Sequence, residues 1–204
     1  MISLGRVTTD GMPRERLLAF AKDSHMTQIA ASAGAAGEAR FADAFGPVTL
    51  ATFAQKPSGA HLFRVQHELL VHLMSRAVTS TEGEVGPESA LHARNALTTL
   101  TTLLPVHQSL EDSLVHSALS GEPRARMLAE QFEREMVPLA AEVAALSRRY
   151  PAASSILSAP RGEFAAAASG VFSRLQERFR REERDLFPSF DRVASGAPAA
   201  PVGV

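Results

Sequence analysis

A histidine and a glutamate stand four residues apart in the segment PVHQSLEDSLVH, which reads as part of an apolar helix: His107 and Glu111. Residues spaced four apart lie on the same face of an α-helix, so both side chains are expected on the buried side. An unpaired imidazole or carboxylate is costly to bury, and such groups normally have a polar partner, a shared proton or a metal ion. Imidazole with carboxylate is also the donor set of non-haem iron, manganese and zinc sites.

Three other segments of helical period carry polar residues within an apolar stripe. His67 lies at the centre of the first stripe, and Glu135 lies within the third, with Gln131 on its border. Arg178 and Glu182 interrupt the fourth stripe. Helical bundles build metal sites in this way, from side chains of facing helices. The competing interpretations are hydrogen-bonded core histidines and an ordinary i,i+4 ion pair on the fourth helix.

The other histidines lie off the apolar stripes, and we expect them away from the core: His61, His72, His92 and His116.

The second and fourth segments share an internal pattern. HQSLEDSLV, beginning at His107, aligns without gaps to RFRREERDL, beginning at Arg178. Glu111 then matches Glu182, and arginine stands where the second segment has histidine.

The elements that must position these residues are four long helices. Helical period and Gly/Pro punctuation predict them over residues 60–79, 88–119, 123–149 and 163–193. We therefore predict an all-α protein with an up-down-up-down four-helix bundle over residues 60–193. Residues 1–59 are expected to form an N-terminal arm with possible short helices, and residues 194–204 a flexible tail.

Composition narrows the range of functions. Lys and Arg number 21 against 22 Asp and Glu, and this balance gives no reason to expect a nucleic acid or an anionic membrane as partner. The chain has no cysteine, which excludes disulfides and thiolate ligands, and the N-terminus does not resemble a secretory signal, so a cytoplasmic location is expected. No nucleophile triad, phosphate loop or dinucleotide fingerprint is present, and a non-enzymatic role is favoured.

Four short motifs resemble the hemerythrin-like family of HHE cation-binding domains: QHELL from Gln66, VHQSLED from Val106, FEREM from Phe132 and REERDLFP from Arg181. The resemblance implies a four-helix bundle that holds a non-haem di-iron centre through histidines of all four helices and two bridging carboxylates. By position it makes His67 and His107 histidine ligands. It makes Glu111 one bridging carboxylate and Glu182 the other, with Glu183 as the alternative.

The chain departs from the family pattern in its third and fourth helices. Gln131 and Glu135 stand in the region where the family has two histidines, and Arg178 takes the place of the fourth-helix histidine. In the family, the first and second helices supply the histidines of one iron, and the third and fourth those of the other. We therefore expect a mononuclear site in which the guanidinium of Arg178 replaces the second cation. The alternative is a di-metal site with Glu135 as a replacement ligand.

The expected cofactor is iron, as one or two ions, with manganese or zinc as alternatives. The expected role is sensing of iron, oxygen or nitric oxide, or metal handling, with a small diatomic molecule or peroxide as ligand. The rival hypothesis is a metal-free bundle that acts as a protein interaction module. The sequence points to no particular protein partner.

Overall fold

The structure, a computed structural model, describes residues 59–196. The predicted N-terminal arm, apart from its last residue, and the tail from residue 197 onward lie outside the described residues.

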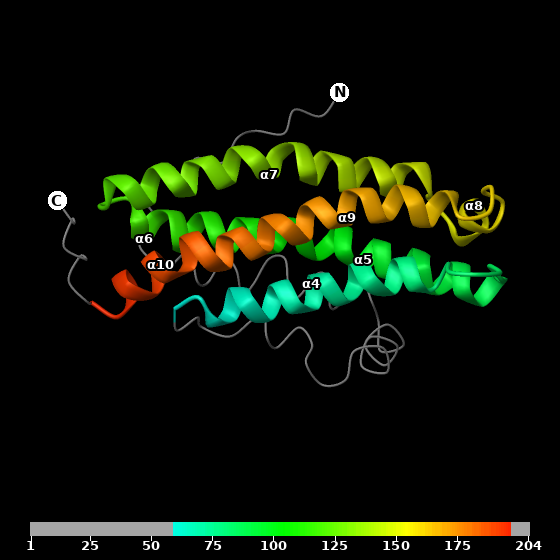
Figure 1. Ribbon diagram of the computed structural model, residues 1–204, viewed down its shortest axis with the longest axis horizontal. Coiled ribbons are helices and arrows are strands. Elements are labelled where there is room, and N and C mark those ends of the chain that lie inside the picture. The colour runs from blue at the N-terminus through cyan, green and yellow to red at the C-terminus, as the bar shows by residue number, and fades with distance from the viewer. Residues whose placement is uncertain (1–58, 197–204) are drawn as a thin grey trace, which may run out of the picture. The chain divides into compact units, whose positions relative to one another are not determined.

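Four long helices run alongside one another in alternating directions (Figure 1): α4 (His61–Thr79), α5 (Pro87–Glu111), α7 (Pro123–Arg149) and α9 (Glu163–Arg181). Helix α4 packs against α5 and α9, and α7 packs against the same two helices. The all-α four-helix bundle is thus confirmed. Short helix α8 (Ala153–Leu157) lies in the α7–α9 connection and packs against α5. Within residues 59–196, no helix combines the length and apolarity needed to cross a membrane.

Proline and glycine mark the helix starts as expected. Pro87 and Pro123 occupy the first turns of α5 and α7, where a missing backbone N–H costs no intrahelical hydrogen bond. Gly162 precedes α9 with φ of +77°, a left-handed conformation that favours glycine.

Two segments of π-helix interrupt what the sequence predicts as unbroken helices. Segment η2 (Asp112–His116) follows Glu111 directly and leads into α6 (Ser117–Leu119). Segment η3 begins at Glu182 (Glu182–Leu186) and leads into α10 (Phe187–Ala194), so Pro188 lies in the first turn of a helix. A π-turn adds one residue to a turn and rotates everything after it, and such turns are frequent at functional sites. Here both begin at, or just after, a buried glutamate.

The start of α4 is fastened to α10 by one carboxylate. Asp191 accepts hydrogen bonds from the backbone N–H of Ala60, at 2.6 Å, and from the guanidinium of Arg64, at 3.0 Å. This contact holds the helix that carries His67 against the chain segment that follows Glu182.

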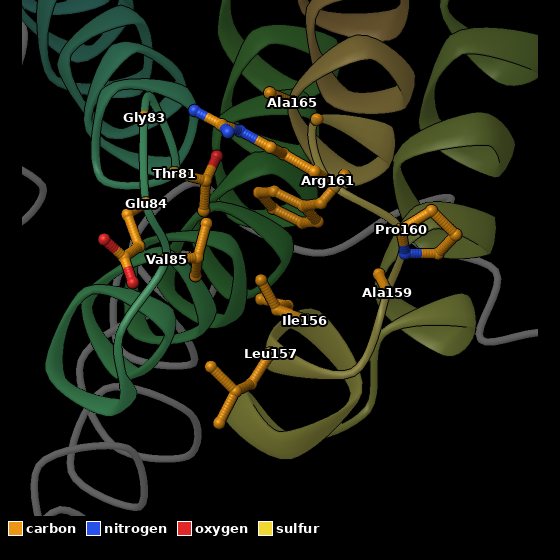
Figure 2. A pocket seen from close by; sticks show the side chains of 12 residues that line it. Thr81, Gly83, Glu84, Val85, Ile156, Leu157, Ala159, Pro160, Arg161 and Ala165 are labelled. Atoms are coloured by element: carbon orange, nitrogen blue, oxygen red, sulfur yellow. The ribbon is translucent and has the colours of Figure 1, made fainter.

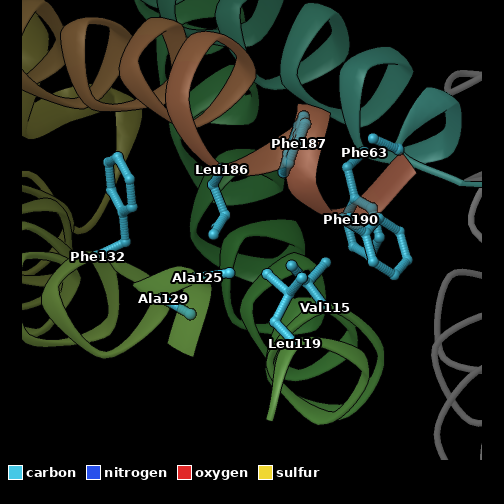
Figure 3. Packing of buried hydrophobic residues seen from close by; sticks show 10 residues of the cluster. Phe63, Val115, Leu119, Ala125, Ala129, Phe132, Leu186, Phe187 and Phe190 are labelled. Atoms are coloured by element: carbon cyan, nitrogen blue, oxygen red, sulfur yellow. The ribbon is translucent and has the colours of Figure 1, made fainter. Parts of the chain in front are cut away.

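An apolar cluster fills the end of the bundle beside α6 and α10 (Figure 3). Its buried members lie just before α4 and in α4, η2, α6, α7, η3 and α10: Ala60, Phe63, Val115, Leu119, Ala125, Ala129, Phe132, Leu186, Phe187 and Phe190. Polar groups buried next to this cluster are therefore shielded from solvent, and their electrostatic interactions are strengthened.

Candidate metal centre

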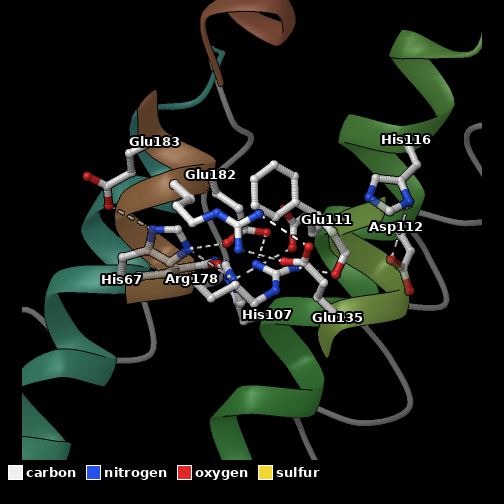
Figure 4. A network of polar contacts seen from close by, with 12 residues as sticks. His67, His107, Glu111, Asp112, His116, Glu135, Arg178, Glu182 and Glu183 are labelled. Carbon is white, nitrogen blue, oxygen red and sulfur yellow. Dashed lines mark hydrogen bonds and ion pairs between the residues drawn. The ribbon is translucent and has the colours of Figure 1, made fainter. Parts of the chain in front are cut away.

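Two imidazoles and one carboxylate converge in the bundle core (Figure 4). His67 on α4, His107 on α5 and Glu182 at the start of η3 each offer one ligand atom, and these three atoms lie within 4.8 Å of one another. The two Nε2 atoms are 3.2 Å apart, and Nε2 of His67 lies 3.4 Å from Oε2 of Glu182. Each of the three residues is at most 2% exposed. The expectation that His67 and His107 point into one core region is confirmed.

The two histidines differ in their affinity for protons. Burial lowers the pKa of His107 to about 3, and the nearby charge of His67 contributes to that decrease. Burial also acts to lower the pKa of His67, but its contacts with Glu182 and Glu183 outweigh burial and raise the pKa. His107 is therefore a neutral imidazole at neutral pH, with one ring nitrogen able to act as an electron-pair donor.

Glu182 forms an ion pair with Arg178 one helical turn earlier, and both side chains are buried. Burial acts to raise the pKa of Glu182, yet its contact with His67 and the charge of Arg178 hold the pKa well below its usual range. The guanidinium of Arg178 also donates a 2.9 Å hydrogen bond to the carbonyl oxygen of Phe132 and lies over that residue's ring. Arg178 thus supplies a fixed positive charge in the core, between α9 and α7.

Glu111 lies at the edge of this cluster. Its Oε2 is 3.9 Å from Nε2 of His107, and its Oε1 is buried without a hydrogen-bond partner among the described residues. Burial and the negative charge of Glu182 raise its pKa well above the usual value. Burial thus favours the protonated form of Glu111, and a cation beside it would favour the ionised, coordinating form.

The structure does not bring Glu135 or Gln131 into the cluster, and the expectation that Glu135 points into the core is wrong. The side chain of Glu135 is one-third exposed, forms a two-pronged ion pair with Arg181 and accepts a hydrogen bond from Gln131, which is exposed. At about 100° per residue, Glu135 lies about 80° from the centre of the residues that α7 buries. Met136, its neighbour, takes the inward position.

Glu183 lies on the other side of the His67 ring from the cluster (Figure 4). Its Oε1 is 2.7 Å from Nδ1 of His67, and its side chain is 38% exposed. Of the two adjacent glutamates, Glu182 therefore faces the cluster and Glu183 supports His67 from outside.

One buried polar residue of this region has no role in the sequence motifs. Gln66 is fully buried, and its Oε1 lies 2.9 Å from Nδ1 of His107. Its position three residues after Phe63 and four before Leu70 follows the apolar spacing of the helix, and this spacing could have identified it as inward-facing.

The remaining histidines lie away from the cluster, as expected. His61 and His72 are exposed, and His92 and His116 are partly exposed. Nδ1 of His116 is 3.6 Å from Asp112 and 3.9 Å from Glu133, both on the outer surface.

Two of the three spacings between the converging atoms match those of neighbouring ligands of one metal ion, and the third pair, His107 and Glu182, lies within 4.8 Å. Ligand atoms about 2.1 Å from one ion lie about 3.0 to 3.4 Å apart when they occupy neighbouring corners of an octahedron or tetrahedron. The His67–His107 and His67–Glu182 distances of 3.2 and 3.4 Å fall within this interval. Glu111 is not among these three converging ligands, but its Oε2 lies 3.9 Å from Nε2 of His107, at the edge of the site.

A surface hollow of about 490 Å³ lies elsewhere, between the end of α4 and the start of α9 (Figure 2). Val85, Ile156, Leu157 and Phe164 contribute apolar surface to it, and Arg161 is among its polar residues. Thr81 in its lining is 14 residues after His67, which corresponds to about 21 Å along a helix at 1.5 Å per residue. The hollow is therefore not an entrance to the polar cluster.

The bundle matches the model of a known protein family. The model of the hemerythrin HHE cation-binding domain matches residues 58–190, about two-thirds of the chain and nearly all of the described bundle. No curated protein and no solved structure matches the chain.

Proposed function

Since this chain belongs to the hemerythrin HHE cation-binding domain family, we propose that its core binds one metal ion between His67, His107 and Glu182. The observation that carries this proposal is the convergence of three buried donor atoms, from three helices, within 4.8 Å of one another, with two of the three distances suited to neighbouring ligands of one ion. Glu111 completes the set as a carboxylate that loses its proton when the cation binds.

A single ion is favoured over a pair because of Arg178. Its guanidinium pairs with Glu182 and lies over the Phe132 ring, on the side of the core where a second ion would need ligands from α7 and α9. The nearest candidate ligand on α7, Glu135, is turned outward to Arg181. A permanently charged guanidinium can neutralise a buried carboxylate without any metal.

We propose iron as the metal, because two imidazoles with carboxylates are a donor set that suits ferrous iron. Manganese and zinc are the alternatives, since they accept the same donors. Ferrous iron held by these residues would supply affinity for oxygen, nitric oxide or peroxide. The role that follows is sensing of iron or of such a small ligand, or metal handling. This chain's own residues contribute a buried, uncharged imidazole at His107 and a strongly acidic carboxylate at Glu182.

A metal-free interaction module is the second candidate. The observation in its favour is that the Arg178–Glu182 ion pair already balances the core charge at this position, and that the cluster lacks histidines from α7 and α9.

Metal analysis of the purified protein after reconstitution with ferrous iron separates the two candidates. About one iron per chain is expected, falling below one-tenth in His67→Ala and in His107→Ala. Replacing His61, His72, His92 or His116 with Ala is the matched control and should leave the iron content unchanged. Wild-type protein that stays free of iron, manganese and zinc would favour the interaction module.

A further inference from the structure

We propose that Gln66 and Glu183 are positioning residues for the metal site: each accepts a hydrogen bond from the Nδ1–H of one histidine and so leaves its Nε2 free to bind the ion. This inference rests on the proposed function. The two contacts are 2.9 Å, from His107 Nδ1 to Oε1 of Gln66, and 2.7 Å, from His67 Nδ1 to Oε1 of Glu183.

The chemistry of the two acceptors determines where the ring protons lie. An ionised carboxylate and an amide oxygen only accept hydrogen bonds, so each Nδ1 opposite them must carry a hydrogen. A neutral imidazole has one N–H, and its other nitrogen then carries a lone pair. In a neutral ring that second nitrogen is Nε2, the atom directed at the other histidine. When both rings are neutral, as metal binding requires, two lone pairs face each other at 3.2 Å and can bind a cation.

His107 has a second neutral form, with its hydrogen on Nε2, and the contact with Gln66 disfavours that form. With the hydrogen on Nε2, His107 would donate a hydrogen bond to Nε2 of His67 across the same 3.2 Å. That hydrogen would stand where the ion belongs, and His107 would have no lone pair toward the site. The oxygen of Gln66 favours the binding-competent arrangement over this closed one.

Ring packing keeps both imidazoles in the required planes. The His67 ring stacks with Phe179, with ring centres 4.1 Å apart, and with Phe187, with ring centres 5.4 Å apart. The His107 ring contacts the edges or faces of Phe63 and Phe179 at near-perpendicular angles. Because the ring planes are fixed, the position of the hydrogen on each ring determines whether both Nε2 atoms present a lone pair to the same point.

Burial of Gln66 at this position costs folding free energy, which indicates that the residue has a role beyond packing. It is fully buried, and its Nε2 has no hydrogen-bond partner among the described residues. Burial of an amide with an unsatisfied donor costs free energy that an apolar residue of the same size would avoid. The contact with His107 is the feature that an apolar side chain could not reproduce.

The experiment compares Gln66→Met and Glu183→Leu, which remove the acceptors, with Glu183→Gln, which keeps an acceptor oxygen. Zinc affinity is measured by competition with a chelator, and the proton position on each ring by imidazole ¹⁵N chemical shifts of the metal-free protein. Gln66→Met and Glu183→Leu should each weaken zinc binding about 10- to 100-fold, the usual effect of losing such a partner. Gln66→Met should also move the hydrogen of His107 from Nδ1 to Nε2, and Glu183→Gln should recover most of the affinity.

Gln131→Met and Glu177→Leu are the matched controls, because both side chains are exposed. They should change neither the zinc affinity nor the ring shifts. The inference is overturned if Gln66→Met and Glu183→Leu bind zinc within about two-fold of wild type, or if His107 keeps its hydrogen on Nδ1 without Gln66. Wild-type protein that binds no zinc, iron or manganese contradicts the proposed function instead, and the ring shifts still decide the role of Gln66.

Discussion

The guanidinium of Arg178 and the carboxylate of Glu182 form an ion pair inside the bundle, with side-chain exposures of 4% and 0%. Glu182 also lies 3.4 Å from the imidazole of His67. One carboxylate thus connects a permanent cation to the proposed metal site.

Removal of this buried cation should destabilise the metal-free protein. Arg178→Met leaves Glu182 buried without its partner, and breaking such a pair typically costs about 3–5 kcal/mol. The measurement is the free energy of unfolding in urea. Arg174→Met on the same helix is the control: its ion pair with Glu142 is about half exposed, and its loss should cost less than about 1 kcal/mol. Equal stabilities of the Arg178 and Arg174 variants would contradict a structural role for the buried charge.

Replacing the cation with a ligand should alter the metal stoichiometry. Arg178→His removes the guanidinium and introduces the residue type that the family resemblance implies at this position. We expect iron binding to rise from about one ion per chain toward two, and added iron to recover part of the lost stability. Full recovery is not expected, because α7 offers no histidine near the site. An unchanged content of one ion, with no stabilisation by iron, would show that Arg178 does not replace a second cation.

Glu135 should be dispensable for metal binding. Arg181 lowers the pKa of Glu135, the hydrogen bond from Gln131 adds to this decrease, and the carboxylate stays charged on the surface at neutral pH. Glu135→Gln should therefore keep the full metal content, whereas Glu182→Gln should lose it. Metal analysis of the two variants side by side makes the comparison. Loss of metal from Glu135→Gln would show that Glu135 is a metal ligand and would support the di-metal alternative.

Tyr150 provides a test of the fold that is independent of metal. It is the only tyrosine in the chain, and its hydroxyl donates a 2.9 Å hydrogen bond to Glu163. Burial raises its pKa above the ordinary 10.0, and the bond to Glu163 adds to the rise. Because the folded state keeps this proton longer than the unfolded state, the stabilisation is complete below pH 10 and disappears as pH rises through the folded-state pKa.

Tyrosinate absorbance measures this directly, since no other side chain contributes a tyrosine signal. The midpoint of the folded protein should lie above that of the urea-unfolded protein, and Glu163→Gln should reduce the difference. A folded midpoint at or below the unfolded one would contradict the described packing of α7 against the start of α9.

Much of this arrangement could be predicted from the sequence, because periodicity and punctuation are local signals. The predicted starts of α5 and α7 agree with the structure within about two residues. They were marked in the sequence by Gly86 with Pro87 and by Gly121 with Pro123. The central positions of the stripes were also predictable: His67 and His107 lie about one turn from the fully buried Leu70 and Leu104, and both histidines are buried.

The positions at the edges of the stripes were not predictable in the same way. Glu135 is near the border of the buried face of α7, where a long side chain can turn either inward or outward, and the surface partner Arg181 decides the direction. The π-turns after Glu111 and at Glu182 also escape a fixed period of 100° per residue, because they shift the phase of all later residues. The Nδ1 partners Gln66 and Glu183 depend on contacts between helices that no local pattern contains.

The central claim is that one metal ion lies between His67, His107 and Glu182. A crystal structure of the iron-reconstituted protein, with anomalous scattering recorded at the iron absorption edge, tests it most directly. One anomalous peak per chain is expected, bonded to Nε2 of both histidines and to carboxylate oxygens of Glu182 and Glu111, with Arg178 still paired to Glu182. Two peaks in the core, a peak bound by other residues, or no peak between His67 and His107 would contradict the claim.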